Sequence, residues 1–456
     1  MSATNVDRPE IEAAAEFLLR HAGDKRDLLG ADVLFFCGKS HSLSLLDGSP
    51  EENSCGVSGG ISLRCIGRDG RQGVASSNNF SRSSLAEMAE WSYANCLAGE
   101  RDEGVSLHPG PLAGCDEPLE LFDENLDRVA TAGFRHEACS KMTEAARARD
   151  PKVLSVREAS WSDGAAESFY ASTSGLSGWR RGTSVACGVT VVMKDGESYE
   201  LGSYGQSKRH VGDIDLDEAA RKAVDRTLMI LGGKPLPTGK YTLLLEPETS
   251  ASIVCEIGDM FCASEVHKGR SLMAGRLGQA VAGPITLVDD ARLPRRAASA
   301  SYDSEGVPTG RTVLIDSGVA SAYLYNLQHA AKDGERSTGN ASRGLSSLPD
   351  VGASNLVLQP GPDSPESLAR RVSRGFLVME LMGLHTINPV SGDFSLGAKG
   401  VFVENGEFAG PVAGVTIADN LIGFLKKIAA VGNDLKFFGS IGAPTLLVED
   451  VAIAGE

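Results

Sequence analysis

Apolar residues in the first half of the chain alternate between a helical period and a strand period. Residues 10–21 and 136–148 repeat apolar side chains at helical spacing, and residues 216–231 do so until Gly232 and Gly233 end the pattern. Shorter runs between Gly and Asp turns show strand-like patterns, at 32–46, 60–66, 72–77, 153–160, 184–193 and 198–207. The first half is therefore predicted to be α+β, with its last three strands in a meander.

Two segments allow more detailed predictions. A helix at 84–97 follows a run of serines suited to N-capping, and its period places Leu85, Met88, Trp91 and Ala94 on one stripe. Residues 400–408 read as two strands joined by Asn405-Gly406, which is the residue pair that a tight hairpin turn prefers.

The second half begins after a linker that contains Pro235 and Pro237. A short strand is predicted at 241–245, and Pro247 is placed to start a helix, since proline suits the first helical position. From about residue 285 onward the pattern is mostly strands with glycine turns. We predict two domains, an N-terminal α+β domain at 1–233 and a C-terminal β-rich, barrel-like domain at 234–456.

Composition and charge exclude several classes of function. Of the 456 residues, 42% are hydrophobic and 23% are charged, which is typical of globular proteins. The net charge of −16 and the lack of any Lys/Arg run argue against binding nucleic acid or anionic membranes. No apolar run reaches membrane-spanning length, and residues 1–10 lack the basic and apolar regions of a signal peptide. We expect a soluble, cytoplasmic protein.

The nine cysteines lie at irregular spacings without a Cys-x-x-Cys pair. Together with the odd number and the expected reducing compartment, this predicts free thiols that pack as small hydrophobic side chains.

Three short motifs match catalytic or binding signatures only in part. Residues 56–60 read Gly-x-Ser-x-Gly, but a strand follows them where a hydrolase needs a helix, so we expect a glycine-rich turn. Residues 233–240 have the wrong spacing for a phosphate-binding loop and are interpreted as the linker. His136-Glu137 has no second histidine one turn later, so a solvated helix start is expected there.

The helix that begins at Pro247 is the segment whose chemistry can be weighed. Helical spacing groups Ile253, Ile257, Met260 and Phe261 on one face, and it places Cys255, Asp259 and Cys262 opposite. Cys255, Glu256 and His267 can in principle meet at a metal ion, against the alternative of a packing role. The residues alone leave this open.

A set of short motifs in the second half resembles the TldD/PmbA family. The run at 302–309 (YDSEGVPT) is similar to a PmbA segment, and 337–341 (STGNA) is similar to the segment that follows it in that family. Further similar segments come in the family's order, at 380–383, 391–395, 400–406, 411–412 and 432–434. The first half resembles the family's α+β N-terminal domain more loosely.

The resemblance implies a role in peptide cleavage. In this family a TldD-type chain carries a His-Glu-x-x-x-His helix and a C-terminal cysteine as its zinc site, and it pairs with a PmbA-type chain, also called TldE. Here the helix positions hold Cys255, Glu256 and Met260, and no cysteine follows Cys262. The chain is therefore expected to be the PmbA/TldE-like subunit, with no catalytic residue, metal or cofactor of its own and with zinc in a TldD-type partner.

The expected partners are a TldD-like subunit in a dimer and an unfolded or precursor peptide as substrate, held by strand addition at a sheet edge. Two alternatives stay open. One is a stand-alone or homodimeric peptidase that uses Cys255 and Glu256. The other is a non-enzymatic scaffold or gyrase-modulating protein, in line with the family's older description as a modulator of DNA gyrase.

Overall fold

The first half of the chain builds one antiparallel sheet of long strands. The computed structural model describes residues 6–110 and 117–456. The strand order is β3-β2-β1-β4-β5-β6. The strands are β1 (Leu28–Leu46), β2 (Ser49–Gly67), β3 (Gln72–Ser77), β4 (Val153–Ser172), β5 (Ser177–Asp195) and β6 (Ser198–Lys208). The predicted meander of the last three strands is confirmed, although β4 and β5 are much longer than their apolar patterns indicated.

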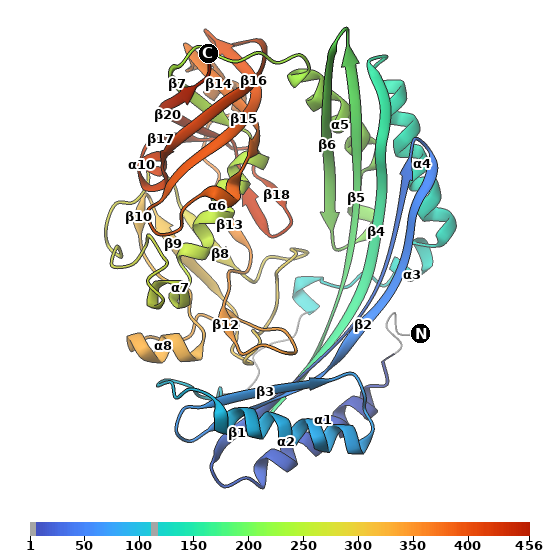
Figure 1. The fold of residues 1–456 in the computed structure, drawn as a ribbon, viewed down its shortest axis with the longest axis vertical. Coiled ribbons are helices and arrows are strands. Elements are labelled where there is room, and N and C mark those ends of the chain that lie inside the picture. The colour runs from blue at the N-terminus through green and yellow to red at the C-terminus, as the bar shows by residue number, and fades with distance from the viewer. Residues whose placement is uncertain (1–5, 111–116) are drawn as a thin grey trace.

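Helices cover one face of this sheet at its two ends (Figure 1). Near one end lie α1 (Arg8–Gly23) and α2 (Arg82–Ala98), and near the other lie α4 (Ala132–Arg149) and α5 (Leu216–Ile230), with the short elements η1 (Glu117–Leu119), α3 (Leu126–Val129) and η2 (Val211–Asp213). Asp7, Ser81, Thr131 and Asp215 cap the four longer helices through their side chains. Each helix pair encloses its own hydrophobic core against the sheet.

The stripe predicted for α2 is wrong in part. Leu85 and Met88 are buried, but Trp91 is 56% exposed and Ala94 is exposed as well. The buried side instead continues through Ser92, whose hydroxyl donates to the carbonyl oxygens of Leu63 and Gly73. A hydroxyl with two acceptors is well accommodated in the core, so the hydrophobic pattern alone misplaced the face.

The Gly-x-Ser-x-Gly run at 56–60 is not a turn, contrary to the prediction. It lies inside β2, paired with β1 from Gly38↔Ser58 to Ser40↔Gly56. A Cβ atom on Gly59 would lie 2.3 Å from the carbonyl oxygen of Phe36, so glycine here allows close approach of two strands. Ser58 lies within a continuous strand and not at a turn between a strand and a helix, so it lacks the setting of a hydrolase nucleophile, as expected.

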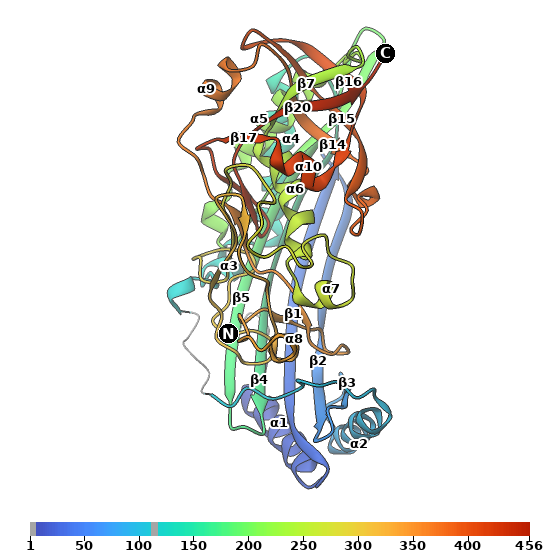
Figure 2. The same cartoon turned by 90° about the vertical axis from the view of Figure 1, so that its left-hand side faces the viewer.

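Small residues occupy the middle of the sheet on the face turned towards the C-terminal half. Gly38 pairs with Ser58 on one side and Ala166 on the other, and the next row along β1 is Ser40 between Gly56 and Gly164. β5 continues these rows with Gly182 and Ser184. Figure 2 shows these strands running from the α1 and α2 end up to the C-terminal half. These rows of Gly, Ser and Ala between the two helix-covered ends form a surface with few large side chains, which we call the small-residue floor.

The C-terminal half contains a closed barrel of five strands. β7 (Gly239–Leu245) pairs with β14 and β20, and the pairing of β16 with β20 closes the order β7-β14-β15-β16-β20. The other barrel strands are β14 (Arg374–Met382), β15 (Asp393–Glu404), β16 (Glu407–Asn420) and β20 (Leu446–Ala454). Asn405 and Gly406, both with positive φ, form the predicted tight turn between β15 and β16. The α+β prediction with a barrel-like C-terminal part is confirmed.

A second sheet and several short elements complete this half. The sheet has the order β10-β9-β8-β13-β19-β18. Its strands are β8 (Leu287–Asp290), β9 (Arg311–Asp316), β10 (Val319–Ala320), β13 (Leu356–Leu358), β18 (Lys436–Phe438) and β19 (Ile441–Ala443). The short elements are α6 (Pro247–Met260), α7 (Ala263–His267), α8 (Leu327–Asp333), β11 (Ala341–Ser342), β12 (Asp350–Val351), α9 (Pro365–Arg370), η3 (Leu384–Thr386), α10 (Leu421–Lys426) and β17 (Ile428–Val431).

The two halves meet at both ends of the long sheet. At the barrel end, Lys399 Nζ lies 2.6 Å from Glu200 Oε1, and Arg226 forms ion pairs with Glu246 and Glu248. At the other end, charged side chains of β1 and β2 reach loops of the C-terminal half. Within residues 6–110 and 117–456, no helix is both long and apolar enough to cross a membrane.

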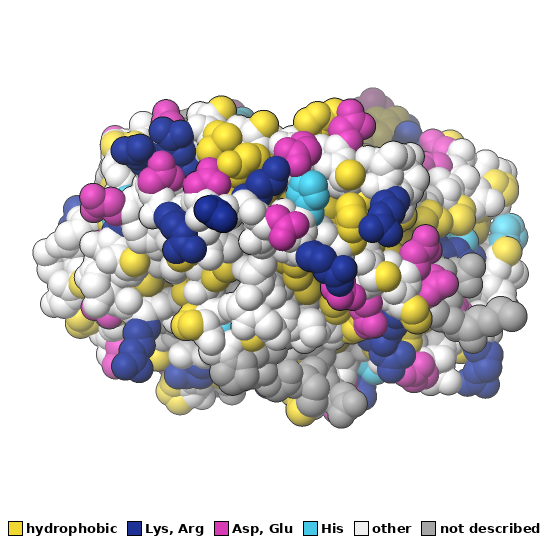
Figure 3. Space-filling model, turned by 90° about the horizontal axis from the view of Figure 1, so that it is seen from below, with side chains coloured by type: hydrophobic (Ala, Val, Ile, Leu, Met, Phe, Trp, Pro, Cys, Tyr) yellow, Lys and Arg dark blue, Asp and Glu magenta, His cyan; other side chains and the backbone are white. Residues whose placement is uncertain are grey.

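The end of the molecule near α1 and α2 carries charges of both signs. Seen from below in Figure 3, Lys and Arg side chains intermingle with Asp and Glu side chains. Several of them form ion pairs, such as Lys25 with Glu90 and Lys332 with Asp102. This face therefore presents no extended field of one sign among the residues drawn in colour.

The described cysteines are all free thiols, and five of them are buried, as predicted for small hydrophobic side chains. Cys37 is half-buried, and Cys55 and Cys255 are exposed, which departs from that prediction. Cys115 lies outside the described residues.

Candidate functional site

Helix α6 holds the positions that the family resemblance singles out. It follows β7 of the barrel and packs against β13, β14, β18 and β19. Ile253, Ile257 and Met260 are buried, as the helical spacing predicted. Cys262 is not on the opposite, solvated face as expected, because α6 ends at Met260 and Cys262 turns into the core as the cap residue of α7, only 2% exposed.

A cavity of about 340 Å³ opens beside the C-terminal turn of α6. Its lining includes four acidic residues, Glu256, Asp259, Glu265 and Asp350, together with Arg270 and several apolar residues. Met260 contributes a thioether to the lining, whereas Cys255, one helical turn earlier, is not part of it. The structure thus brings Glu256 and Met260 to one cavity and leaves Cys255 outside.

The ionisable groups of α6 lie in surroundings that disfavour negative charge. Burial and the nearby Asp259 carboxylate raise the pKa of Glu256, and burial and Glu265 raise the pKa of Asp259. Burial, with Asp259 and Glu256 close by, raises the pKa of the Cys255 thiol, and burial raises the pKa of Cys262 to about 12. Both thiols are therefore protonated at neutral pH, which makes them poor nucleophiles.

These residues do not fit the zinc ion that the family resemblance implies at this helix. A catalytic zinc needs three protein ligands, usually imidazole, thiolate or carboxylate, around an open position. Here the two histidine positions hold Cys255, which lies outside the cavity that Glu256 lines, and Met260, which offers only a thioether. In the described parts of the chain, no three His, Cys, Asp or Glu side chains are arranged to hold a metal ion.

His267 is engaged elsewhere and does not join Cys255 and Glu256, so the weighed metal set is not assembled. Its Nδ1 lies 2.7 Å from Nδ1 of His329 on α8, and its Nε2 lies 2.8 Å from Asp333 Oδ1. Tyr325 donates its hydroxyl to the other oxygen of Asp333, at 2.9 Å. This chain of contacts ties α7 to α8.

The motif segments at 302–309 and 337–341 build a turn that depends on buried polar groups. Both oxygens of Asp303 are used, one by the backbone N–H groups of Glu305 and Val307 and the other by that of Ala341. Asn340 donates to Asp289 Oδ2 at 2.8 Å and so joins this turn to β8. The motifs that carried the family resemblance thus shape a loop at the sheet, some distance along the chain from α6.

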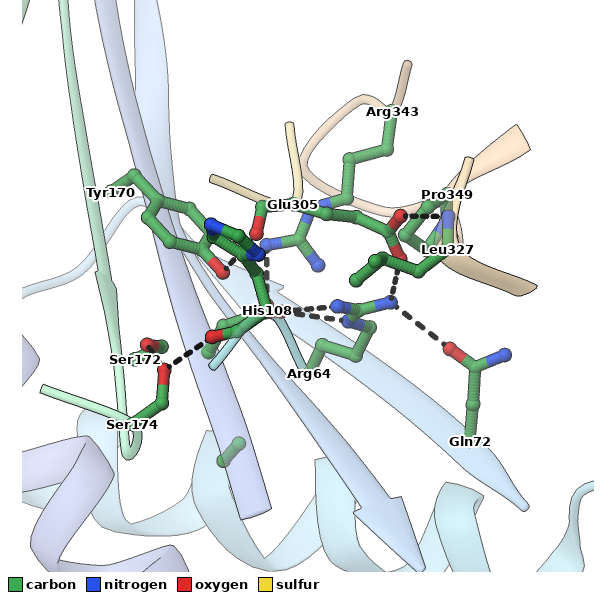
Figure 4. Close-up of polar contacts among 12 residues, drawn as sticks. Arg64, Gln72, His108, Tyr170, Ser172, Ser174, Glu305, Leu327, Arg343 and Pro349 are labelled. Carbon is green, nitrogen blue, oxygen red and sulfur yellow. Dashed lines mark hydrogen bonds and ion pairs between the residues drawn. The ribbon is translucent and has the colours of Figure 1, made fainter. Parts of the chain in front are cut away.

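That loop meets the sheet through a buried ionic network, part of which is drawn in Figure 4. Arg64 donates to Asp32 and lies 3.2 Å from Glu305 Oε1, while Arg343 Nη2 lies 2.6 Å from Asp32 Oδ1. Burial favours the neutral form of Asp32, but Arg343 and Arg64 outweigh it and hold its pKa below the ordinary value. Glu305 also accepts the backbone N–H of Leu327, so one carboxylate connects β2 to the start of α8.

The network was missed at the level of sequence. Asp32 and Arg64 are single charged residues within apolar strand patterns, and that is a signal of a buried partner. Asp32 and Arg64 pair with each other across β1 and β2, but their other partners, Glu305 and Arg343, lie more than 200 residues away in sequence, so nothing local identifies those two.

Comparison with known proteins agrees with this architecture. Three family models match in order: PmbA/TldA metallopeptidase domain 1 at 31–96, the central domain at 131–231 and the C-terminal domain at 238–455. The metalloprotease PmbA of Escherichia coli O157:H7 is 25% identical, over 100% of this chain and 98% of the relative.

Two solved structures share the fold. A Thermotoga maritima protein described as a candidate modulator of a DNA gyrase is 26% identical with a TM-score of 0.88, over 97% of this chain and 100% of that chain. TldE of Thermococcus kodakarensis, at 23% identity, has a TM-score of 0.85 over 97% and 100% of the two chains. The family models together span most of the chain, and the chain therefore belongs to the PmbA/TldD metallopeptidase family, as a PmbA/TldE-like member.

Proposed function

We propose that this chain is the metal-free, PmbA/TldE-like subunit of a cytoplasmic TldD/PmbA-type metallopeptidase that cleaves unfolded or precursor peptides. In this proposal a TldD-type partner carries the zinc ion and performs the hydrolysis. The chain described here completes the enclosure in which the peptide is held. It contributes no catalytic residue.

One observation carries the proposal. At α6, the ligand positions of the family hold a protonated thiol and a thioether, and Glu256 faces a cavity lined by other carboxylates. Hydrolysis of an amide by zinc needs the ligand set and a carboxylate that takes a proton from the bound water. Here only the carboxylate is present, and its raised pKa reflects burial and Asp259.

The long sheet offers a place for peptide capture by strand addition. Residues 49–59 of β2 are exposed along their whole length, and in the described chain they pair with β1 alone, because β3 covers β2 only from Ile61 onward. An edge of this kind presents free main-chain N–H and C=O groups to an extended segment. Main-chain hydrogen bonds accept many sequences, so low side-chain selectivity is expected.

The test is reconstitution with the TldD-type chain of the same genome. Zinc content and cleavage of an unfolded peptide are measured for each chain alone and for the pair. We expect both to be absent from this chain alone and present in the pair. Glu256→Gln in this chain should leave the activity of the pair almost unchanged, with the corresponding glutamate of the partner as the matched control that abolishes it.

Other outcomes would contradict the proposal. Stoichiometric zinc and cleavage by this chain alone would show a stand-alone or homodimeric peptidase. If the genome has no chain with a His-Glu-x-x-x-His helix, the partner role fails. The scaffold or gyrase-modulating alternative would then be tested by DNA supercoiling with purified gyrase.

A further inference from the structure

The junction between the two halves at the barrel end is built from charged side chains, most of which are carboxylates. Four carboxylates and two cations meet there, from α5, from the start of α6 and from strands β6, β14 and β15. They form what we call the junction cluster: Glu200, Arg226, Glu246, Glu248, Glu380 and Lys399. All six residues are half-buried, so water screens their charges only in part. The cluster therefore has an excess of negative charge when every group is ionised.

Arg226 of α5 contacts two of the carboxylates, but its N–H groups are poorly directed at them. Its Nη1 atom lies 2.6 Å from Glu246 Oε1, and its Nη2 atom lies 2.9 Å from Glu248 Oε2. Both oxygens are buried, yet neither accepts a well-aligned hydrogen bond from the described residues. Arg226 Nη2 donates instead to the carbonyl oxygen of Met379, at 3.3 Å. Charge thus holds α6 to α5, while two buried oxygens lack the donors that would stabilise an anion.

Lys399 of β15 balances only one of the remaining two carboxylates. Its Nζ atom lies 2.6 Å from Glu200 Oε1, but 3.8 Å from Glu380 Oε2, which is beyond hydrogen-bonding range. Burial raises the pKa of Glu380, and the neighbouring Glu200 and Glu248 add to the rise. The charges of Lys399 and Arg226 oppose this rise without cancelling it.

Glu246, which begins α6, is the carboxylate where a proton is most favoured. Burial raises its pKa to about 7, and the adjacent Glu248 adds to the rise. Arg226 and Lys436 of β18 are the cations that act on Glu246 in the opposite direction. The loss of water and the second carboxylate therefore outweigh both cations, and Glu246 exchanges its proton near neutral pH.

We propose that the junction cluster is a pH-dependent clamp, in which a proton bound by Glu246 strengthens the attachment of α6 to α5. The proton lowers the repulsion between Glu246 and Glu248 while the contact of Arg226 with Glu248 is kept. Because the pKa of Glu246 is higher in the folded junction than in an exposed carboxyl, the proton's contribution is full in acid and is lost as the pH rises through about 7. The clamp acts on the helix of the candidate site, but the inference does not depend on the proposed function.

Hydrogen–deuterium exchange, followed by mass spectrometry, measures how readily this junction opens. Exchange in residues 220–231 of α5 and 247–256 of α6 is compared between the parent chain and Glu246→Gln, whose amide cannot titrate. Both chains are measured at the same pH, so that the chemical exchange rate cancels. We expect the exchange rate of the parent relative to the variant to rise by at least about tenfold between about pH 5.5 and about pH 8. The control is Glu404→Gln, at an exposed carboxylate of β15 outside the cluster, and it should follow the parent.

Two further measurements keep the test independent of how well Glu246→Gln folds. Glu248→Gln removes the neighbouring negative charge and should move the change in exchange to lower pH. Infrared difference spectra of the parent between about pH 5.5 and about pH 9 should contain the band of a protonated carboxyl, and Glu246→Gln should reduce it. Equal pH dependence of exchange in the parent and in Glu246→Gln would overturn the inference. So would an unchanged infrared band in that variant, an unchanged midpoint in Glu248→Gln, or a loss of the pH dependence in Glu404→Gln.

Discussion

Arg64 should be among the most costly residues of the chain to neutralise. Its side chain is 1% exposed, and its partners Asp32 and Glu305 are 0% and 3% exposed. Arg64→Met keeps the aliphatic stem but leaves two buried carboxylates short of a cation. Removing one partner of a buried pair costs about 3–5 kcal/mol. Since Asp32 keeps Arg343 and Glu305 keeps the Leu327 N–H, we expect the lower end, about 3 kcal/mol.

The measurement is urea unfolding followed by tryptophan fluorescence. All three tryptophans, Trp91, Trp161 and Trp179, lie in the first half, so the signal reports on the long sheet. The matched control is Arg157→Met, which removes an exposed ion pair with Glu51 at 3.1 Å and should cost less than about 1 kcal/mol. A double variant with Glu305→Gln should cost less than the sum of the single changes, by about 1 kcal/mol or more. If Arg64→Met cost no more than the control, or if the two changes were additive, the assignment of this network as the junction would be refuted.

Two more predictions concern the barrel and the paired histidines. A Cβ atom on Gly400 would lie 1.8 Å from the carbonyl oxygen of Leu377, so Gly400→Ala should lower the free energy of unfolding in urea by roughly 3 kcal/mol. The control is Gly310→Ala, where a Cβ atom would have nothing within 4 Å, and it should be nearly neutral. Equal effects of the two substitutions would contradict this. Burial and the neighbouring His267 and Lys332 lower the pKa of His329 from 6.5 in the folded chain. The neutral imidazole therefore contributes stability to the folded state above pH 6.5, and this stability is lost as the pH falls through the lower pKa of the folded state. With His267, Asp333, Asp350 and Asp102 unchanged around it, His329→Gln should therefore lose less stability between about pH 7 and pH 5 than the parent chain, and an identical pH profile would speak against this role.

The fold could be predicted as far as local pattern reaches. Elements with clear periods, such as α5 and the Asn405-Gly406 hairpin, lie where the sequence placed them. The full length of β4 and β5 could not be read, because the parts that were missed, 161–172 and 177–183, mix Gly, Ser and Ala with charged residues such as Asp163, Arg180 and Arg181. Segments of that composition show no clear apolar alternation, and their pairing is decided by the neighbouring strands.

Part of the candidate site could also be predicted from local sequence pattern, and part could not. The position of α6 and its buried face followed from helical spacing, whereas the assignment of the family's zinc-ligand positions to Cys255 and Met260 came from the resemblance alone and stays a prediction. The end of α6 at Met260 was not foreseen, and it moved Cys262 from the solvated face into the core. The contact of His267 with His329 and the ionic network of Arg64 depend on chain segments that meet only in the folded structure.

The small-residue floor of the long sheet has a mechanical consequence. At both ends, helices and large apolar side chains hold the strand register firmly, whereas the middle rows around Gly38 and Gly164 have little side-chain packing to resist distortion. Glycine also gives the backbone there more conformational freedom. The two ends of the sheet should therefore resist bending more strongly than the middle does. Bending in that middle zone would widen or narrow the space above it while both anchored junctions with the C-terminal half stay intact.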